Sequence, residues 1–290
     1  MVNKRLIYDV GAHKGEDTEF YLKKGFAVVA IEAIPEFCVS LEKKFGKFLR
    51  DDQLKILNVA VSKTTGPVDF YINETQSIWG TSNPDWVARN RILGAGKTHK
   101  ISVIGRPLLD IIKEYGVPWY CKIDIEGNDL DALQSLIGAS ETPPFVSIES
   151  EKRDWIRLME EFLTFRELGY SRYKIVDQTL VNLHTCPRPA REGDYCDHIF
   201  ELGSSGLFGD ELPGSWLALP EAVEAYRQIF RGYALNGNNG MFSQGRGIFS
   251  IFNTLGRIQG KVAQLRRFSA YVNPAAILPP ASWYDTHAAQ

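Results

Sequence analysis

The sequence predicts an α/β fold built on a mostly parallel sheet, and three observations lead to this prediction. Apolar strand patterns alternate with helical patterns from residue 6 to residue 178, and short links join them. Several strands are almost continuous apolar runs, which is typical of parallel strands that are buried on both faces. Carboxylates stand at the ends of three strands, where open α/β sheets bind their ligands.

The individual elements follow from these patterns. Glycine, proline and polar residues bound the predicted strands, and amphipathic spacing marks the predicted helices. The strands predicted for the sheet are 6–10, 27–33, 54–62, 119–125, 144–151, 170–178 and 197–203. The helices predicted between them are 16–25, 36–48, 107–116, 128–138 and 154–169, and the last should bury Trp155, Ile156, Met159, Phe162 and Leu163.

Charge divides the chain into two parts. Between Ala225 and Tyr284 there is no Asp or Glu, whereas the net charge of the whole chain is only −2. We predict a main domain at 1–214 and a basic helical appendage at 215–290. An apolar stripe at 248–265 is compatible with a lid over the main domain, a homodimer helix or a membrane-surface helix, and docking on the same chain is the commonest of these.

Composition favours an enzyme of the cytoplasm. With 44% hydrophobic residues, the chain can bury one large core. No apolar run approaches the roughly 18–20 residues that a transmembrane helix requires, and the N-terminus has no apolar leader. The four cysteines lack the pattern of a secreted scaffold, so we expect reduced thiols.

The first candidate site is the segment LIYDVGAHKG, from Leu6 to Gly15. It is typical of a strand that enters a glycine-rich turn and then a helix N-terminus, which is a common binding place for a polar or anionic small molecule. The glycines are spaced GxxxG, so the GxGxxG of a dinucleotide site is absent. Asp9, two residues before Gly11, indicates another class of cofactor.

The second candidate site is the segment WYCKIDIEGNDL, residues 119–130. Lys122, Asp124 and Glu126 share one face of the predicted strand, and burying three charges is costly unless they pair or meet a ligand. In one interpretation Lys122 pairs with a carboxylate, and Glu126 or Asn128 caps the next helix. In the other, the carboxylates bind a ligand at the carboxyl end of the strand.

The irregular segment 74–100 is a third candidate, because long irregular segments in compact domains are often lids or substrate loops. Its candidate substrate-binding residues are Trp79, Ser82, Asn83 and Trp86. A surface loop that its aromatic side chains pin to the core is equally compatible with the sequence.

A polar loop carries two pairs of metal-ligating residue types. The pairs HxC and CxH are formed by His184, Cys186, Cys196 and His198. Zinc sites more often use CxxC or HxxxH spacing, so we expect no metal site there. His198 is an alternative active-site residue if it lies near the pocket.

Four segments in order narrow the interpretation: DVGAHKGEDTEFYLKKGF, VVAIEAIPE, NVAVS and KIDIEGNDLDAL. Together they resemble the FkbM-type family of class I S-adenosylmethionine-dependent methyltransferases, over about residues 7–206. The resemblance implies a Rossmann-like fold with a seven-stranded sheet of order 3-2-1-4-5-7-6 and the last strand antiparallel. It also implies O-methylation of a hydroxyl on a sugar, glycan or secondary metabolite. We expect no nucleic-acid partner.

The resemblance further implies a set of cofactor residues. Glu32, at the end of the second strand, would accept hydrogen bonds from both ribose hydroxyls, a task that suits a carboxylate with two oxygens. Many family members have Asn and an apolar residue in place of His13 and Lys14, so the surroundings of the methionine carboxylate are expected to differ. The implied S-adenosylmethionine residues are Asp9, Gly11, Ala12, His13, Gly15 and Glu32, with Asn58 and Val59 beside the adenine.

Transfer of a methyl group to a hydroxyl requires alignment and a base. Asp124 and Glu126 are the best-placed bases, and His13 is the alternative because its ordinary pKa is near 6.5. Lys122 is predicted to bind the acceptor, together with the candidate residues of segment 74–100. A divalent metal on Asp124 and a neighbouring carboxylate would serve a vicinal diol, but we do not expect one.

Two other functions are compatible with the sequence. An NAD(H)- or nucleotide-sugar-binding oxidoreductase also has an acid at the end of the second strand. A non-catalytic protein could keep the methyltransferase fold without its chemistry. Binding of S-adenosylhomocysteine without NAD⁺ would argue against the first, and methyl transfer would argue against the second.

Overall fold

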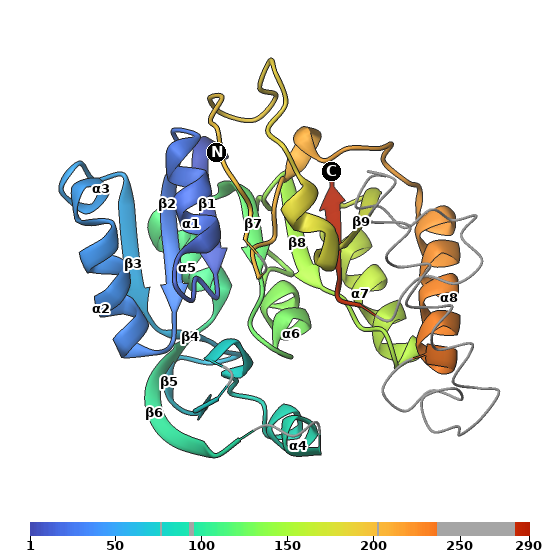
Figure 1. Cartoon of the computed structure of the whole chain (residues 1–290), viewed down its shortest axis with the longest axis horizontal. Helices are drawn as coiled ribbons and strands as arrows, with labels where there is room; N and C mark the ends of the chain where they lie inside the picture. The colour runs from blue at the N-terminus through green and yellow to red at the C-terminus, as the bar shows by residue number, and fades with distance from the viewer. Residues whose placement is uncertain (76, 93–95, 202, 237–281) are drawn as a thin grey trace. The chain divides into compact units, whose positions relative to one another are not determined.

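The structure is a computed structural model that describes residues 1–75, 77–92, 96–201, 203–236 and 282–290 (Figure 1). The chain forms two compact units. The first consists of Met1–Glu149 with Pro187–His198, and the second of Ser150–Cys186 with Ile199–Gln290. The apolar stripe predicted at 248–265 lies outside the described residues.

The main sheet has seven strands in the order β3-β2-β1-β7-β8-β10-β9. Neighbouring strands from β3 to β8 are parallel, whereas β10 is antiparallel to β9. Counted along the chain, this is the predicted order 3-2-1-4-5-7-6, so the Rossmann-like methyltransferase fold is confirmed. The strands are β1 (Asn3–Val10), β2 (Ala27–Glu32), β3 (Leu54–Asn58), β7 (Pro118–Ile123), β8 (Phe145–Glu149), β9 (Arg172–Asp177) and β10 (Tyr284–Ala289).

The prediction of the seventh strand at 197–203 is wrong. Residues 197–201 are not a strand, and β10 takes the place in the sheet instead. All six residues of β10, YDTHAA, are buried, but they lack the apolar run by which buried strands are found. The segment predicted as a helical appendage therefore also contains a strand of the sheet.

The helices pack on the strands that they connect. In the first unit, α1 packs on β1 and β2, α2 on β2 and β3, and α6 on β7 and β8. None of the described helices combines the length and the apolar character needed to cross a membrane. The α-helices are α1 (Glu16–Lys23), α2 (Pro35–Lys44), α3 (Gly46–Arg50), α4 (Pro84–Ile92), α5 (Leu108–Tyr115), α6 (Asp129–Gln134), α7 (Trp155–Glu167) and α8 (Leu219–Asn236), and the 3₁₀ turns are η1 (Ser77–Trp79), η2 (Gln178–Leu183) and η3 (Gly209–Glu211).

The buried face of α7 differs from the predicted one. Ile156 is 71% exposed and Leu163 is 60% exposed, although both were predicted to be buried. Leu158, Phe162 and Phe165 form the buried stripe, at helical spacing. Because apolar residues surround this helix, spacing alone does not decide which of two stripes faces the core.

A second sheet, of order β4-β6-β5, stands beside the carboxyl ends of β1, β2 and β7 (Figure 1). Its strands are β4 (Ala60–Val61), β5 (Gly66–Asn73) and β6 (Thr98–Arg106). The strand predicted at 54–62 is divided, since β3 belongs to the main sheet and β4 to the second. A small apolar core of Ala33, Ile34, Ala60, Phe70 and Val103 fixes the second sheet against the end of β2.

Candidate active site

The site begins where β1 runs into α1. Gly11 has a φ of 84°, and its N–H donates to Ile31 O at 2.9 Å, which ties the turn to β2. A Cβ at Gly11 would lie 1.9 Å from the backbone oxygen of Asp124. The turn therefore requires glycine both for its conformation and for its close approach to the end of β7. Ala12 and Gly15 close the same turn, because the N–H of Gly15 donates to Ala12 O at 2.7 Å.

Glu32 stands at the end of β2 and organises the neighbouring backbone. Its Oε2 accepts from the N–H of His13 and its Oε1 from the N–H of Ile34, both at 2.8 Å. Burial raises the pKa of Glu32, although these two hydrogen bonds lower it. Each oxygen of a carboxylate has two acceptor sites, so capacity for ribose hydroxyls remains.

Asn58 and Val59 follow β3 at the same edge of the sheet. The Nδ2 of Asn58 donates to Glu32 O and to Ala33 O, at 3.0 Å each. Val59 is half-buried, and its N–H donates to Leu57 O at 3.0 Å. Asn58 thus holds the backbone that carries Glu32.

His13 has a left-handed backbone, with a φ of 48°. Its Nδ1 lies 3.4 Å from Glu16 Oε1, and its ring meets Phe37 edge to face with centroids 4.7 Å apart. Burial raises the pKa of Glu16, but the hydrogen bond from His13 and further contacts outweigh burial and lower it. The imidazole is therefore held on the α1 and α2 side of the turn.

Lys122 is a buried ion-pair centre between β1 and β7. Its Nζ lies 3.2 Å from Asp9 Oδ1, 3.4 Å from Asp17 Oδ2 and 3.7 Å from Asp124 Oδ2. It also donates to Gly11 O at 3.2 Å. Burial lowers the pKa of Lys122, but Asp9, Asp124 and Asp17 together raise it well above the ordinary lysine value, so the ammonium stays charged.

Asp9 is completely buried beneath the turn. Its Oδ2 accepts from Thr18 Oγ1 at 2.5 Å, and its Oδ1 accepts from Lys122. The carboxylate that precedes the glycines is thus bound to α1 and β7.

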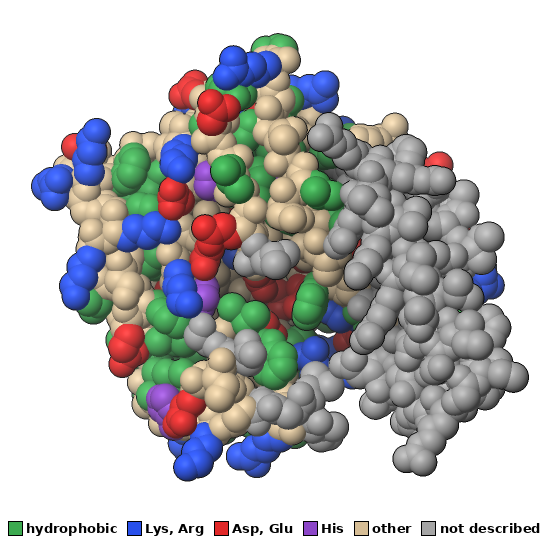
Figure 2. All heavy atoms as spheres, viewed as in Figure 1, with side chains coloured by type: hydrophobic (Ala, Val, Ile, Leu, Met, Phe, Trp, Pro, Cys, Tyr) green, Lys and Arg blue, Asp and Glu red, His purple; other side chains and the backbone are tan. Residues whose placement is uncertain are grey.

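Asp124 and Glu126 begin an acidic group at the end of β7. The side chain of Asp124 is 37% exposed, and burial together with Glu149 raises its pKa although Lys122 lowers it. Burial and the carboxylates of Glu149, Asp124 and Asp129 raise the pKa of Glu126 well above the ordinary value. Burial and the carboxylates of Asp124 and Glu149 raise the pKa of Asp129 to about 8, although hydrogen bonds from the backbone of Ile125 and Gly127 lower it. Figure 2 shows acidic side chains in a recess of the face that it draws.

The loop of residues 124–128, which we call the catalytic loop because the predicted bases Asp124 and Glu126 lie in it, has an unusual backbone. Glu126 has a φ of 52° and Gly127 a φ of 97°. Asp129 accepts from the N–H of Ile125 at 3.2 Å and from that of Gly127 at 3.1 Å. A buried carboxyl group therefore fixes the loop from within the first turn of α6.

Segment 81–86 braces the catalytic loop from outside. Thr81 Oγ1 donates to Glu126 O at 2.7 Å, and Asn83 Nδ2 donates to Gly127 O at 3.2 Å. The indole of Trp86 covers Gly127 so closely that a Cβ there would lie 2.2 Å from its Nε1. The brace is therefore specific for a glycine at this position.

Ser82 and Trp79 complete the placement of the predicted substrate residues. Ser82 Oγ accepts from Asn128 Nδ2 at 2.9 Å, so three of the four predicted residues of the irregular segment contact the catalytic loop. Trp79 ends η1 and is half-buried.

Among the described residues, no group of three or more His, Cys, Asp or Glu side chains is arranged to hold a metal ion. His184 lies in the second unit, and burial lowers its pKa to about 4. Its Nδ1 accepts from the N–H of Leu207 at 3.3 Å. His198 packs on Phe20 with ring centroids 5.1 Å apart, and burial lowers its pKa.

The family comparison decides the class of protein. The methyltransferase FkbM domain matches residues 9–172, which is more than half of the chain. The chain belongs to the FkbM methyltransferase family. The match includes the turn, Glu32 and the catalytic loop, and membership implies S-adenosylmethionine as the cofactor.

Solved structures resemble this FkbM methyltransferase only distantly. Precorrin-6y C5,15-methyltransferase from Geobacter metallireducens GS-15 is 8% identical with a TM-score of 0.34, and the match covers 61% of this chain and 69% of that one. The METTL16 methyltransferase domain is 13% identical with a TM-score of 0.34, covering 61% and 54%. A putative rRNA-methylase from Clostridium thermocellum is 9% identical with a TM-score of 0.32, covering 60% and 77%. These similarities carry no acceptor over to this protein.

A search of the curated proteins found no significant match.

The chemistry of the residues at this edge fits S-adenosylmethionine. Glu32 offers acceptor sites for ribose hydroxyls, because its two backbone hydrogen bonds use only part of the capacity of its carboxylate oxygens. The turn from Gly11 to Gly15 lies at the ends of β1 and β2, which is where the fold binds ligands.

Several residues that shape the site were not predicted from the sequence. Asp17 and Thr18 act within α1, where an acid in the first turn looks like an ordinary helix start. Asp129 supports the catalytic loop, whereas Glu126 or Asn128 was the predicted cap. Glu149 ends β8; the sequence showed it as a carboxylate at a strand end, but it was not assigned to the site.

Proposed function

We propose that this chain is an S-adenosylmethionine-dependent O-methyltransferase that acts on a hydroxyl group of a sugar, glycan or secondary metabolite. The acidic group at the end of β7, with Glu126 of raised pKa, carries this proposal. A hydroxyl must lose its proton as it attacks the methyl group, and a carboxylate of raised pKa is a suitable base.

The cofactor supplies an electrophilic methyl group on a sulfonium centre. Glu32 would bind the ribose hydroxyls through acceptor sites that its two backbone hydrogen bonds leave open. The carboxylate of Asp9 is buried beneath the turn, so Asp9 would support the cofactor-binding turn indirectly, through its hydrogen bond with Lys122. The remaining cofactor contacts are assigned to Gly11, Ala12, His13, Gly15, Asn58 and Val59.

The proton of the acceptor would pass to Glu126. Asp124, beside Lys122, would accept a hydrogen bond from the acceptor, which orients the reacting oxygen. The contacts of His13 with Glu16 and Phe37 favour a role on the cofactor side. Asn83, Ser82 and Trp86 would form the acceptor side of the site by holding the catalytic loop.

Calorimetry tests the cofactor. S-adenosylhomocysteine should bind to the full chain and NAD⁺ should not, because Glu32 and the turn from Gly11 to Gly15 are assigned to S-adenosylmethionine. Binding of NAD⁺ without binding of S-adenosylhomocysteine would contradict the proposal and favour an oxidoreductase.

Turnover tests the base. The change Glu126→Gln should lower kcat by about 10²–10⁴-fold, as expected for loss of a general base, and leave the affinity for S-adenosylhomocysteine within about twofold. Methyl transfer from labelled cofactor to a panel of hydroxylated metabolites is the assay, and Glu36→Gln, at an exposed position on α2, is the control. No transfer to any acceptor, together with normal cofactor binding, would favour a non-catalytic protein.

A further inference from the structure

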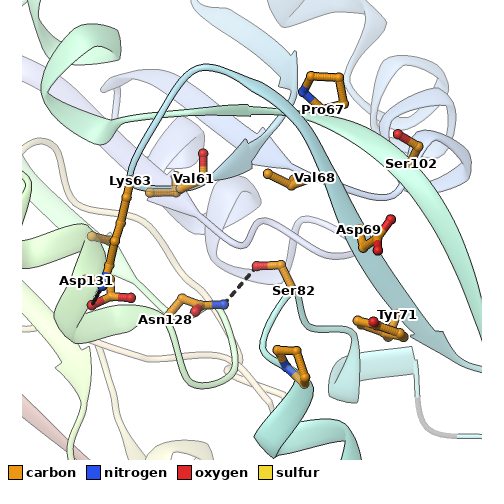
Figure 3. Close-up of a pocket in the computed structure, with 13 residues that line it drawn as sticks. Val61, Lys63, Pro67, Val68, Asp69, Tyr71, Ser82, Ser102, Asn128 and Asp131 are labelled. Carbon is orange, nitrogen blue, oxygen red and sulfur yellow. Dashed lines mark hydrogen bonds and ion pairs between the residues drawn. The ribbon is translucent and has the colours of Figure 1, made fainter.

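A pocket of 490 Å³ lies beside the catalytic loop, between the second sheet and the start of α6 (Figure 3). Tyr71 and Asp69 of β5 line one side, and Asp131 of α6 lines the other. Figure 3 shows the hydrogen bond between Asn128 and Ser82 at its edge. The volume falls within the roughly 300–1,000 Å³ of small-molecule sites.

We propose that this pocket binds the acceptor and that the acceptor is an uncharged, polyhydroxylated molecule of the glycoside class. The inference rests on the proposed methyl transfer and adds the place and chemistry of its second substrate.

The lining has the chemistry of a sugar site. Ser62, Ser82 and Ser102 present hydroxyls and Asn128 presents an amide, all of which both donate and accept hydrogen bonds. Tyr71 is half-buried and adds an aromatic ring, which can cover an apolar sugar face. An aliphatic polyketide chain offers these polar groups no hydrogen bonds, so it would gain less from this lining than a polyhydroxylated ligand.

The charges at the pocket are paired. Lys63 Nζ lies 3.1 Å from Asp131 Oδ1, and Lys100 Nζ lies 3.1 Å from Asp69 Oδ2. A phosphate or carboxylate on the acceptor would have to compete with Asp131 and Asp69 for these lysines. Among the residues that line the pocket, Asp69 and Asp131 carry two negative charges against the one positive charge of Lys63, so the lining favours a neutral ligand over an anionic one.

The pocket and the catalytic loop share their supports. Asn128 belongs to the loop and lines the pocket, two residues after Glu126. Ser82 lines the pocket and accepts from Asn128, and its neighbour Asn83 donates to Gly127 O. An occupant of the pocket is thus in contact with the segment that carries the proposed base.

Saturation-transfer NMR on the full chain with S-adenosylhomocysteine tests the inference. The probes are the methyl glycosides of glucose, galactose, mannose and rhamnose, with glucose 1-phosphate as the anionic comparison. The change Ser102→Trp fills the pocket from an exposed position on β6, and His99→Trp is its control, exposed on the same strand and outside the lining.

At least one glycoside should bind more tightly than glucose 1-phosphate. Ser102→Trp should weaken that binding at least tenfold, His99→Trp should not, and both variants should bind S-adenosylhomocysteine normally. Tyr71→Ala should weaken the glycoside, with Tyr71→Phe close to the wild type.

Two results would overturn the pocket assignment: no glycoside binds, or Ser102→Trp and His99→Trp behave alike. Glycoside binding that depends on Ser102 and Tyr71 without any methyl transfer would support the pocket while refuting the proposed function. If the protein methylates a sugar and Ser102→Trp does not change the rate, the proposed function is supported and the pocket assignment is refuted.

Discussion

Lys122 shows how one buried charge can hold two motifs of an active site. It joins Asp9, below the glycine turn, to Asp124, in the catalytic loop. The sequence predicted that Lys122 binds the acceptor. In the structure its ammonium group lies within 4 Å of three carboxylates. A pairing of Lys122 with a carboxylate was foreseen as one of two interpretations, but the part of Asp17 was not.

The change Lys122→Met should destabilise the protein by about 3–5 kcal/mol, because it leaves buried carboxylates without their partner. Urea unfolding at pH 7 measures the loss. The loss should shrink as the pH falls, since protonated carboxyl groups no longer need the ammonium.

Lys100→Met is the matched control, because it removes an exposed ion pair with Asp69. Such pairs contribute about 0–1 kcal/mol. Equal losses in the two variants would contradict the assignment of Lys122 as a buried centre.

The raised pKa of Asp129 makes the free energy of unfolding depend on pH. Its pKa of about 8 in the folded chain lies above its ordinary value, so the folded state holds this proton more tightly than the unfolded state. Its contribution to stability is present below the unfolded pKa and is lost as the pH rises toward 8. The slope for one proton reaches at most about 1.4 kcal/mol per pH unit.

The free energy of unfolding should therefore fall more steeply between pH 5 and pH 8 in the wild type than in Asp129→Asn. Chemical denaturation across this range is the measurement. Parallel curves for the two proteins would show that Asp129 ionises as an exposed aspartate does.

At the scale of elements, the turn between β1 and α1 is built as much for packing as for ligand binding. Gly11 leaves room for the backbone of Asp124, so the ends of β1 and β7 can meet. The sequence assigned this glycine to the cofactor-binding turn. The structure adds a contact within the protein that requires it.

Gly11→Ala should destabilise the protein by more than Gly138→Ala, although both residues have a φ of 84°. A Cβ at Gly138 meets nothing within 4 Å, so only the left-handed backbone costs energy there, about 1–2 kcal/mol. At Gly11 the contact with Asp124 O should add about 1–3 kcal/mol. Urea unfolding of both variants is the test, and equal losses would argue against the contact.

The carboxylates at the strand ends of the site were predictable because each follows an apolar strand pattern in the sequence. Glu32, Asp124 and Glu126 were found in this way. The brace was only partly predictable, since Asn83 and Trp86 were named as substrate contacts, whereas their contacts are with Gly127. The helix α4 was missed because its sequence, PDWVARNRI, has almost no amphipathic pattern.

For the molecule as a whole, the main difference from the sequence-based prediction is strand β10. Its burial depends on polar side chains that bond to one another, a pattern that hydrophobicity cannot reveal. Thr286 Oγ1 lies 2.6 Å from Ser150 Oγ and 2.7 Å from Tyr226 OH, and it links β10 to α8. Truncation at Gly214 would remove β10 as well as the basic segment, so a test of that segment has to retain Tyr284–Ala289.

The change Thr286→Val should lower the free energy of unfolding by about 1–3 kcal/mol, because it leaves the hydroxyls of Ser150 and Tyr226 without this partner. Thr286→Ser keeps the hydroxyl and should recover most of the loss. Thermal unfolding followed by circular dichroism measures both. If the serine variant is no more stable than the valine variant, packing rather than hydrogen bonding explains the strand.

The pairing of β9 with β10 also bears on synthesis of the chain. Asp177 and Ser282, which are hydrogen-bonded in the folded protein, are 105 residues apart in sequence. At about 5–20 residues per second, a ribosome needs roughly 5–20 s to make the intervening chain. Throughout that interval the edges of β8 and β9 that β10 later pairs with have no partner strand, and such open edges are where wrong strand pairing can begin.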